Sequence, residues 1–518
     1  MERPLTLNNG ERGRFSRLTM PLVFAIPAFV AFSAWSGTLS FGFLSDDFIF
    51  IFFASNATPA DFIKNFYQLE GAIFCRPLVH LLWGFDTFLW ARETWGYHLT
   101  NLLLHSANAS MVAILTRKVS KNPRVSVAAG VIFAVYPAFA EVVAWLSGRY
   151  DLLSTFFYLT CLISFLNYRA DAARRLWRAI SLVSMLLAFM SKENAIVLPL
   201  AILATDLILC PRTRSVFKVN YPYWILTVVF LAYRTVSMRG VGLTGYDHGA
   251  LSVTHVAGSL SATVLGPFNH HTTDARVILV FTLFVIFALS ISIVATGADS
   301  FFSRKVLFSI VIFALPLITV IYLLPVVEDL RKSRLIYLPS VGFAIFTAIV
   351  LFPEKRKSYI GYLFIAPLLA GYISGIAWNL EPFEKAGRIA GKVIAETKEY
   401  CRGLPFGSKV YYIGLPDNIE GAYLFQNGIT FALALENGYR LEDAGFNASV
   451  YRMETRLPIT AWRINDKGDA GVHMEPGELA DIVKRKDSCV LMWKAGPEKL
   501  TRLSQKRHKP TNIQSTKD

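Results

Sequence analysis

The sequence predicts an α-helical polytopic membrane protein with about eleven transmembrane helices and a small C-terminal domain of the α/β or α+β class. The 518 residues are 53% hydrophobic and 17% charged, and the mean hydropathy of +0.42 is too high for a soluble domain of this length. Apolar runs of bilayer-spanning length recur between about residues 18 and 377. From residue 378 the composition turns polar and no such run follows.

The same composition excludes a soluble enzyme, a disordered chain and a disulfide-rich secreted module. The net charge of +15 does not indicate a nucleic-acid partner, because the basic residues lie between apolar runs and not in one patch. Five cysteines without a CxxC pair form no disulfide framework.

Eleven apolar runs are candidate transmembrane helices. The first follows Arg12, Arg14 and Arg17; a cleaved signal peptide is the alternative there, but the run is long for a signal and has no clear small-residue cleavage site. The eleven runs cover residues 18–37, 97–116, 125–145, 152–168, 178–191, 195–211, 220–236, 276–297, 305–325, 335–352 and 358–377.

The charges between the runs predict the orientation in an inner or plasma membrane. Lysine and arginine are concentrated in alternate loops, such as 117–124 and 355–357, whereas acidic residues are more frequent in the others. The positive-inside rule then places the N-terminal tail, residues 1–17, in the cytoplasm. With an odd number of spans, the long loop 38–96 and the C-terminal segment 378–502 lie outside.

The C-terminal segment alternates short apolar runs with turn residues. Glu384–Tyr400 predicts an exposed helix, and Lys409–Ile413 and Ser488–Trp493 predict strands, with further apolar residues in Ala422–Leu435. This pattern is typical of a small α/β or α+β domain. The polar, basic tail 503–518 is predicted to be disordered.

Cys401 and Cys489 are the only cysteines of this outer domain. Cys401 follows the predicted helix and Cys489 begins a predicted strand, so a helix packed on the sheet would bring them within disulfide reach. A disulfide in an oxidising compartment is one interpretation. Two unrelated buried thiols are the other.

Ionisable residues cluster at the predicted outer ends of the helices, where a single outward-facing polar cavity would gather them. Taken singly, each has a plainer explanation: loop charges are usually solvated, Lys192-Glu193 fits a short interfacial turn, and Arg149 and Asp151 could pair locally. The candidates are Asp46, Asp47, Arg76, His98, Glu141, Arg149, Asp151, Lys192, Glu193, Arg234, Arg334 and Tyr337.

The sequence predicts no metal site. His270, His271 and Asp274 have metal-ligand chemistry, but a coincidence within one loop explains them better.

Several stretches resemble one family. Cys75-Arg76-Pro77-Leu78, the acidic pair Asp46-Asp47 and the run from Gly96 to His105 (GYHLTNLLLH) are similar to the transmembrane and TPR-containing O-mannosyltransferases and their bacterial relatives. Order and spacing match over roughly residues 40–345. Further matching stretches are Tyr136-Pro137, Glu141, Gly148-Arg149-Tyr150-Asp151-Leu152-Leu153, Ser191-Lys192-Glu193 and Arg334-Leu335-Ile336-Tyr337-Leu338-Pro339-Ser340.

This resemblance implies a GT-C glycosyltransferase fold, a polyprenyl-phosphate-linked sugar donor and inversion at the sugar's anomeric carbon. Two features depart from the family: Tyr136 stands where histidine is usual, and a different small domain follows the membrane part in place of the tetratricopeptide repeats. The acceptor would be a glycan, lipid or protein hydroxyl, reached from within the membrane lipids.

The residue types suit this chemistry. Asp46 is the candidate general base for the acceptor hydroxyl, with Asp47 orienting it or the acceptor, and adjacent carboxylates push one pKa upward. The departing lipid phosphate gains charge and needs cations, for which Lys192, Arg149, Arg234 and Arg334 are candidates. The other candidates are predicted to bind substrate; a divalent metal is compatible with such a site but not required.

Three alternatives remain. A lipid-linked sugar transporter or flippase would favour charges at the membrane midplane and repeated halves, and neither pattern is present. A binding or scaffold protein would tolerate Asp46→Asn. A transferase of whole oligosaccharides, or of another lipid-linked group, is the third alternative and stays within the enzymes.

Overall fold

The structure is a computed structural model of the chain. It describes residues 15–67, 74–171, 173–210, 216–238, 260–261, 264–296, 303–320, 328–353, 359–402, 408–436, 459–464, 481, 483–486 and 488–503. Residues 1–14 of the predicted N-terminal tail and nearly all of the predicted disordered tail lie outside the described residues.

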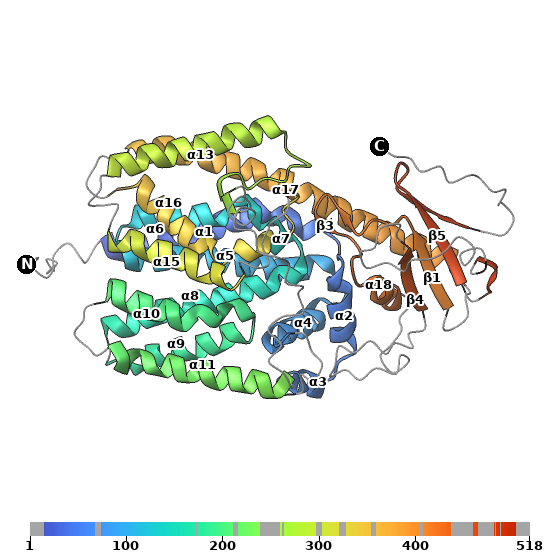
Figure 1. Cartoon of the computed structure of the whole chain (residues 1–518), viewed down its shortest axis with the longest axis horizontal. Helices are drawn as coiled ribbons and strands as arrows, with labels where there is room; N and C mark the ends of the chain where they lie inside the picture. The colour runs from blue at the N-terminus through green and yellow to red at the C-terminus, as the bar shows by residue number, and fades with distance from the viewer. Residues whose placement is uncertain are drawn as a thin grey trace, which may run out of the picture.

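A bundle of roughly aligned helices makes up the larger part of the molecule (Figure 1). Each of the eleven predicted runs overlaps a helix. α5 lies inside the bundle and packs against α1, α6 and α8. The helices are α1 (Phe15–Trp35), α5 (Thr94–Ser120), α6 (Pro123–Ala134), α8 (Arg149–Ala170), α9 (Arg175–Phe189), α10 (Leu198–Leu209), α11 (Val216–Met238), α13 (Ala275–Thr296), α15 (Arg304–Ile318), α16 (Ser340–Leu351) and α17 (Tyr359–Tyr400).

Length does not confirm the count of eleven spans. Among the described residues six helices are long and apolar enough to cross a bilayer, or seven if one bent pair forms a single span. α9, α10, α15 and α16 have only 12–15 residues, against about 20 for a full crossing. The finding is a multi-pass membrane protein.

The bent pair replaces the predicted run 125–145. α6 ends before Pro137, and a 47° bend leads into Pro137–Ala144, which comprises η2 (Pro137–Phe139) and α7 (Ala140–Ala144). The residue before a proline is disfavoured in the helical conformation, and Tyr136 is extended at φ −70°, ψ 113°. The break directs the following residues across one end of the bundle.

The predicted loop 38–96 is largely helical. It contains η1 (Ser36–Ser40), α2 (Asp46–Asn56), α3 (Pro59–Lys64) and α4 (Pro77–Trp90). These helices cover the end of the bundle next to the smaller domain (Figure 1). Three short helical turns complete this part: η3 (Leu146–Gly148), η4 (Glu193–Val197) and η5 (Ser333–Ile336).

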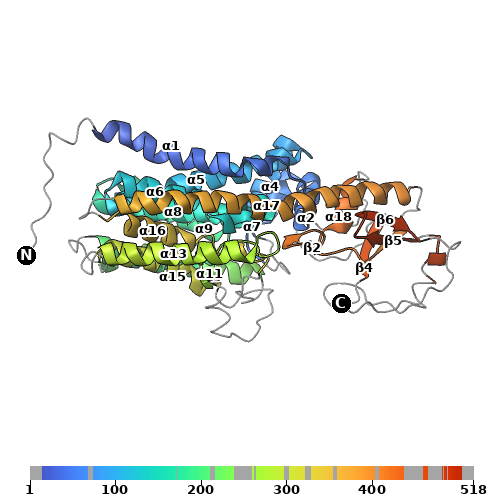
Figure 2. The ribbon, with the colours of Figure 1, turned by 90° about the horizontal axis from the view of Figure 1, so that it is seen from above.

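α17 joins the bundle to the smaller domain. The predicted span 358–377 and the predicted separate helix Glu384–Tyr400 form one helix of 42 residues, about 63 Å long at ~1.5 Å per residue. Its first part packs on α13 and α16 and its last part on the C-terminal elements. Figure 2 shows α17 extending beyond one end of the bundle; α1 begins at the opposite end.

The C-terminal part is built on a four-stranded mixed sheet in the order β4-β1-β5-β6. β1 pairs in parallel with β4 and β5, and β5 pairs antiparallel with β6. Both predicted strands form, as β1 and β5. The elements are β1 (Ser408–Ile413), β2 (Asn418–Ile419), β3 (Ala422–Tyr423), α18 (Ile429–Glu436), β4 (Ile459–Ile464), β5 (Ser488–Lys494) and β6 (Lys499–Arg502).

Cys401 and Cys489 are buried between α17 and the sheet as free thiols. The thiol of Cys401 hydrogen-bonds the sulfur of Cys489, which raises the pKa of Cys401 and lowers the pKa of Cys489. The sequence therefore identified two neighbours correctly. A covalent bridge between them stays a prediction.

Candidate functional site

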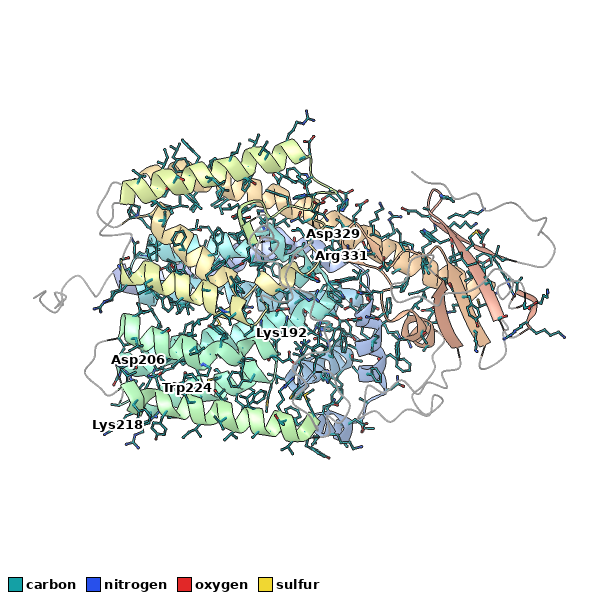
Figure 3. The ribbon with its side chains drawn as sticks, in the orientation of Figure 1. Lys192, Asp206, Lys218, Trp224, Asp329 and Arg331 are labelled. Atoms are coloured by element: carbon teal, nitrogen blue, oxygen red, sulfur yellow. The ribbon has the colours of Figure 1, made fainter. Side chains whose placement is uncertain are left out.

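A cavity of about 280 Å³ opens at the end of the bundle that faces the C-terminal domain. Its walls come from α2, α4, η3, α8, η5 and the segments before η4 and α18. Figure 3 labels one of its residues, Lys192, near the inner side of this end. The lining residues are Asp46, Ile49, Phe50, Phe74, Arg76, His80, Trp145, Ser147, Tyr150, Asp151, Lys192, Arg334 and Asn427.

The two adjacent carboxylates of α2 point in different directions, because successive helix residues are rotated by about 100°. Asp46 lines the cavity and accepts a hydrogen bond from Nδ2 of Asn427 at 2.9 Å. Asp47 is 1% exposed and accepts hydrogen bonds from the amide of Leu44 at 2.9 Å and from the amide and hydroxyl of Ser147 at 3.1 Å. Asp46 is thus available to a ligand, whereas Asp47 holds the backbone around it.

Burial determines the protonation of both carboxyl groups. It raises the pKa of Asp46, while the hydrogen bond from Asn427 and the charge of Arg334 oppose that shift. Burial also raises the pKa of Asp47 to about 7. The ionised Asp46 carboxylate is therefore a stronger base than a solvent-exposed aspartate, which is the direction that favours general-base catalysis.

Three ion pairs bring cations to the cavity wall. Nη2 of Arg76 lies 2.8 Å from Glu193, and Nζ of Lys192 lies 2.6 Å from both oxygens of Asp151. Arg334 pairs with Glu141 through its side chain and also donates its backbone amide at 2.9 Å. All three cations line the cavity, whereas Glu141 and Glu193 lie behind it. Each cation is thus held in place by a carboxylate.

Aromatic rings surround these cations. The guanidinium of Arg76 lies 3.9 Å from the ring centroid of Phe74 and 4.9 Å from that of Tyr150. The guanidinium of Arg334 lies 5.3 Å from the ring of Trp145. Such stacking fixes the plane of each guanidinium, whose N–H groups already donate to Glu193 from Arg76 and to Glu141 from Arg334. Phe50 adds a fourth aromatic side chain.

Known proteins resemble the chain in part of its sequence and in its fold. No protein-family profile matches the chain. Protein O-mannosyl-transferase Tmtc1 of Drosophila melanogaster is 32% identical over 193 residues, which are 35% of this chain and 21% of that protein. Human protein O-mannosyl-transferase TMTC3 is 23% identical over 379 residues, which are 62% of this chain and 41% of that protein.

A solved structure extends the likeness to the whole fold. The crystal structure of ArnT from Cupriavidus metallidurans bound to undecaprenyl phosphate superimposes with a TM-score of 0.50 at 12% identity, over 91% of this chain and 93% of that one. The chain resembles the TMTC O-mannosyl-transferases in part of its sequence and ArnT in its fold. It spans about a fifth to two fifths of the length of these two curated relatives.

In this GT-C-like protein several predicted site residues do not line the cavity. Arg149 was expected to bind phosphate, yet it is fully buried, lies 2.9 Å from Asp86 and stacks at 3.8 Å on the ring of Trp83. Arg149 here completes an internal ion pair at the start of α8, and phosphate binding by this residue stays a prediction. Asp47 does not line the cavity either, because its carboxylate accepts hydrogen bonds from the amide of Leu44 and from the amide and hydroxyl of Ser147.

The remaining predicted residues outside the cavity wall are packed into the bundle. Tyr337 is buried, with its hydroxyl 2.9 Å from Nδ1 of His105. His98 is buried with its ring centroid 6.3 Å from that of Phe41. Arg234 is buried on α11. These three side chains shape the GT-C-like bundle and do not face this cavity.

Sequence analysis missed several lining residues of the GT-C-like site. Tyr150 lies between Arg149 and Asp151, so an aromatic residue between two charges was an available signal. Trp145 and Phe50 have only apolar neighbours in the sequence and offered no such signal. His80 also lines the cavity, and burial lowers its pKa to about 4, so it adds no charge near neutral pH. Asn427 gave no signal, because only the fold brings it to Asp46.

No metal cluster is found within the described parts of the chain: none of their histidine, cysteine, aspartate and glutamate side chains form a group of three suited to a metal ion. In the loop that contains His270, His271 and Asp274, the Asp274 carboxylate pairs with Arg276 at 2.8 Å. The amide of His270 donates to the carbonyl of Glu328. The metal requirement itself stays untested.

Proposed function

We propose that this protein is an inverting glycosyltransferase that moves one sugar from a polyprenyl-phosphate donor to an acceptor hydroxyl at the outer face of the membrane. The observation that carries the proposal is the cavity that joins the Asp46 carboxylate to three cations and four aromatic rings. The names of the TMTC relatives and the lipid phosphate bound to ArnT support the reaction and donor class.

In the proposed reaction Asp46 takes the proton of the acceptor hydroxyl as its oxygen attacks the anomeric carbon. The new carbon–oxygen bond forms on the face opposite the leaving group, and the bond from that carbon to the phosphate oxygen breaks. The electron pair stays on the phosphate, so the anomeric centre inverts in a single displacement.

The departing phosphate would be stabilised by Arg76, Lys192 and Arg334. These cations oppose charge that grows in the transition state, and their carboxylate partners keep them oriented before substrate arrives. The two guanidinium groups suit paired hydrogen bonds to phosphate oxygens, while the lysine acts as a point charge. All three cations line the cavity, where a lipid phosphate could contact them together.

The size of the cavity favours a single sugar over a whole oligosaccharide. Its volume of about 280 Å³ is at the small end of ligand sites, which are roughly 300–1,000 Å³. The four aromatic side chains offer apolar faces on which a sugar ring can stack. The outward position of the site follows from the predicted orientation and is part of the proposal.

Asp46→Asn provides the direct test. The purified protein in lipid nanodiscs would receive radiolabelled polyprenyl-phosphate sugars and a panel of hydroxyl acceptors. We expect transfer to fall by about 10²–10⁴-fold, with donor binding retained. Asp274→Asn, which alters an exposed carboxylate away from the cavity, is the matched control and should behave as the parent.

Two outcomes would contradict the proposal. Near-parental turnover of Asp46→Asn would remove Asp46 from the role of base. Translocation of labelled lipid by the parent in proteoliposomes, without transfer to any acceptor, would favour the flippase.

A further inference from the structure

A loop of the C-terminal domain is docked on the start of α2. The amide of Ser45 donates to the carbonyl of Leu424 at 3.0 Å, and the amide of Asn427 donates to the hydroxyl of Ser45 at 3.3 Å. Ser45 itself has φ 44°, a left-handed conformation that is rare for a residue with a side chain. The residue before Asp46 is therefore held in an unusual conformation by contacts with the other domain.

Packing fixes this loop in position. The ring of Phe425 stacks on that of Phe48 with centroids 6.0 Å apart, and Phe431 packs on Phe52 at 5.4 Å. Gly428 has φ +86°, and a Cβ there would lie 2.1 Å from the carbonyl oxygen of Ser45. The loop therefore cannot slide along α2 without breaking these contacts.

A second contact ties the same region to the bundle. Nδ2 of Asn269 donates to the carbonyl of Glu420 at 2.7 Å, and the side chain of Glu420 lies 3.3 Å from Lys385 of α17. A Cβ on Gly421 would lie 2.2 Å from the carbonyl oxygen of Asp329. The contacts with α2 and those of Glu420 and Gly421 thus hold the loop on both sides. They fix the position of Asn427 at the cavity.

We propose that Asn427 is a positioning residue for sugar transfer, through which the C-terminal domain completes the site. Its Nδ2 holds Oδ1 of Asp46 at 2.9 Å and so fixes the direction in which the carboxylate receives the acceptor proton. This inference rests on the proposed function, because it assigns Asn427 a role through Asp46.

The chemistry of an amide suits this role. An amide donor carries no net charge, so it orients the carboxylate without neutralising it, unlike the nearby cation of Arg334. A donated hydrogen bond also favours the ionised base over the protonated one. The other ionisable groups around Asp46 in the described structure are Asp47 on its own helix and Arg76, His80, Tyr150, Asp151, Lys192 and Arg334 across the cavity.

Asn427→Ala tests the inference in the full-length protein. We expect kcat to fall roughly 10- to 100-fold through misorientation of the base, with little change in donor KM. The acidic limb of the pH–rate profile should move to higher pH, because the lost hydrogen bond lowers the pKa of Asp46 in the parent. Asn427→Gln, which keeps an amide donor, should recover part of both effects.

Asn418→Ala is the comparison variant: Asn418 lies in the same domain, donates to Asp417 and accepts from the amide of Gly421, so its loss disturbs the anchor of the domain without removing a contact to Asp46. Thermal unfolding of all variants separates activity from folding. Equal kcat losses in Asn427→Ala and Asn418→Ala, or an unmoved acidic limb in Asn427→Ala, would overturn the inference. Asp46→Asn measured in parallel separates the two proposals: if it stays active, the assignment of the base fails first.

Discussion

The two ends of the helical bundle hold ion pairs of the same chemistry in different surroundings. At the cavity end Nζ of Lys192 lies 2.6 Å from Asp151, and both side chains line the cavity. At the other end Nε of Arg169 lies 2.7 Å from Asp206, and both side chains are buried. Figure 3 labels Lys192 and Asp206 at these two ends. The first pair lines the cavity, so it can exchange part of its pairing for a ligand.

Position along the bundle does not by itself decide the role of a charge. Arg149 directly precedes the cavity residue Tyr150, yet the side chains of Arg149 and of its partner Asp86 are both 0% exposed. Charges inside a membrane protein are expensive and so suggest function. A buried charge is therefore a candidate for ligand binding only where it also lines a cavity. A buried ion pair that lines no cavity stabilises the packing of the bundle.

The largest effect that we expect comes from breaking the buried pair of Arg149 and Asp86. Arg149→Met should cost roughly 3–5 kcal/mol of stability, because it leaves the Asp86 carboxylate buried without its cation. Transfer per folded molecule should stay near that of the parent. Thermal and denaturant unfolding in detergent, with activity measured on the folded fraction, provide the readout.

Arg149→Met combined with Asp86→Asn is the control for this experiment. The double variant should regain much of the lost stability, since an asparagine oxygen can still accept the hydrogen bond that Thr100 donates at 2.7 Å. A well-folded Arg149→Met protein with weakened donor binding would return Arg149 to phosphate binding and break the comparison.

Lys192→Met should have the next largest effect, on catalysis. Removing one cation from the leaving phosphate should lower kcat by about 10²–10³-fold and weaken donor binding. The single variant also leaves Asp151 uncompensated, so Lys192→Met with Asp151→Asn is needed beside it. If the double variant regains stability but not transfer, the lysine acts on substrate; if transfer also returns, its role was only to neutralise Asp151.

The sequence identified much of the fold because burial in a bilayer leaves a strong signal. All eleven apolar runs contain helices, and the runs at Lys409 and Ser488 form neighbouring strands. The end of the bundle that holds the cavity was also predictable, since Lys192, Arg334 and Asp46 follow apolar runs on one expected face. Each of these inferences uses properties of neighbouring residues only.

The remaining errors concern direction and distant contacts. Asp46 and Asp47 are chemically equivalent in the sequence, and only the rotation of α2 decides which one faces the cavity. Arg149 appeared ligand-binding because its partner Asp86 is 63 positions away and was not recognised. Asn427 is separated from Asp46 by 381 positions, and a hydrogen bond over that distance depends on the complete tertiary structure.

The smallest expected effect distinguishes Asp47 from Asp46. Asp47→Asn should cost about 1 kcal/mol near pH 5, because an amide cannot accept all three hydrogen bonds that the carboxyl group accepts. Burial raises the pKa of Asp47 from 3.8 to about 7, so the folded protein holds this proton more tightly than the unfolded chain. Its contribution to stability is then complete below about pH 4 and is lost as the pH rises through 7.

The cost of Asp47→Asn should therefore shrink between pH 5 and pH 8, measured as the difference in unfolding free energy from the parent. Asp61→Asn is the control of opposite sign: hydrogen bonds from Thr58 lower the pKa of Asp61, so its contribution is lost as the pH falls. A cost for Asp47→Asn that grows with pH, like that for Asp61→Asn, would mean that Asp47 is ionised when folded. Two neighbouring carboxylates would then share one electrostatic environment, and the rotation of α2 would not separate their roles.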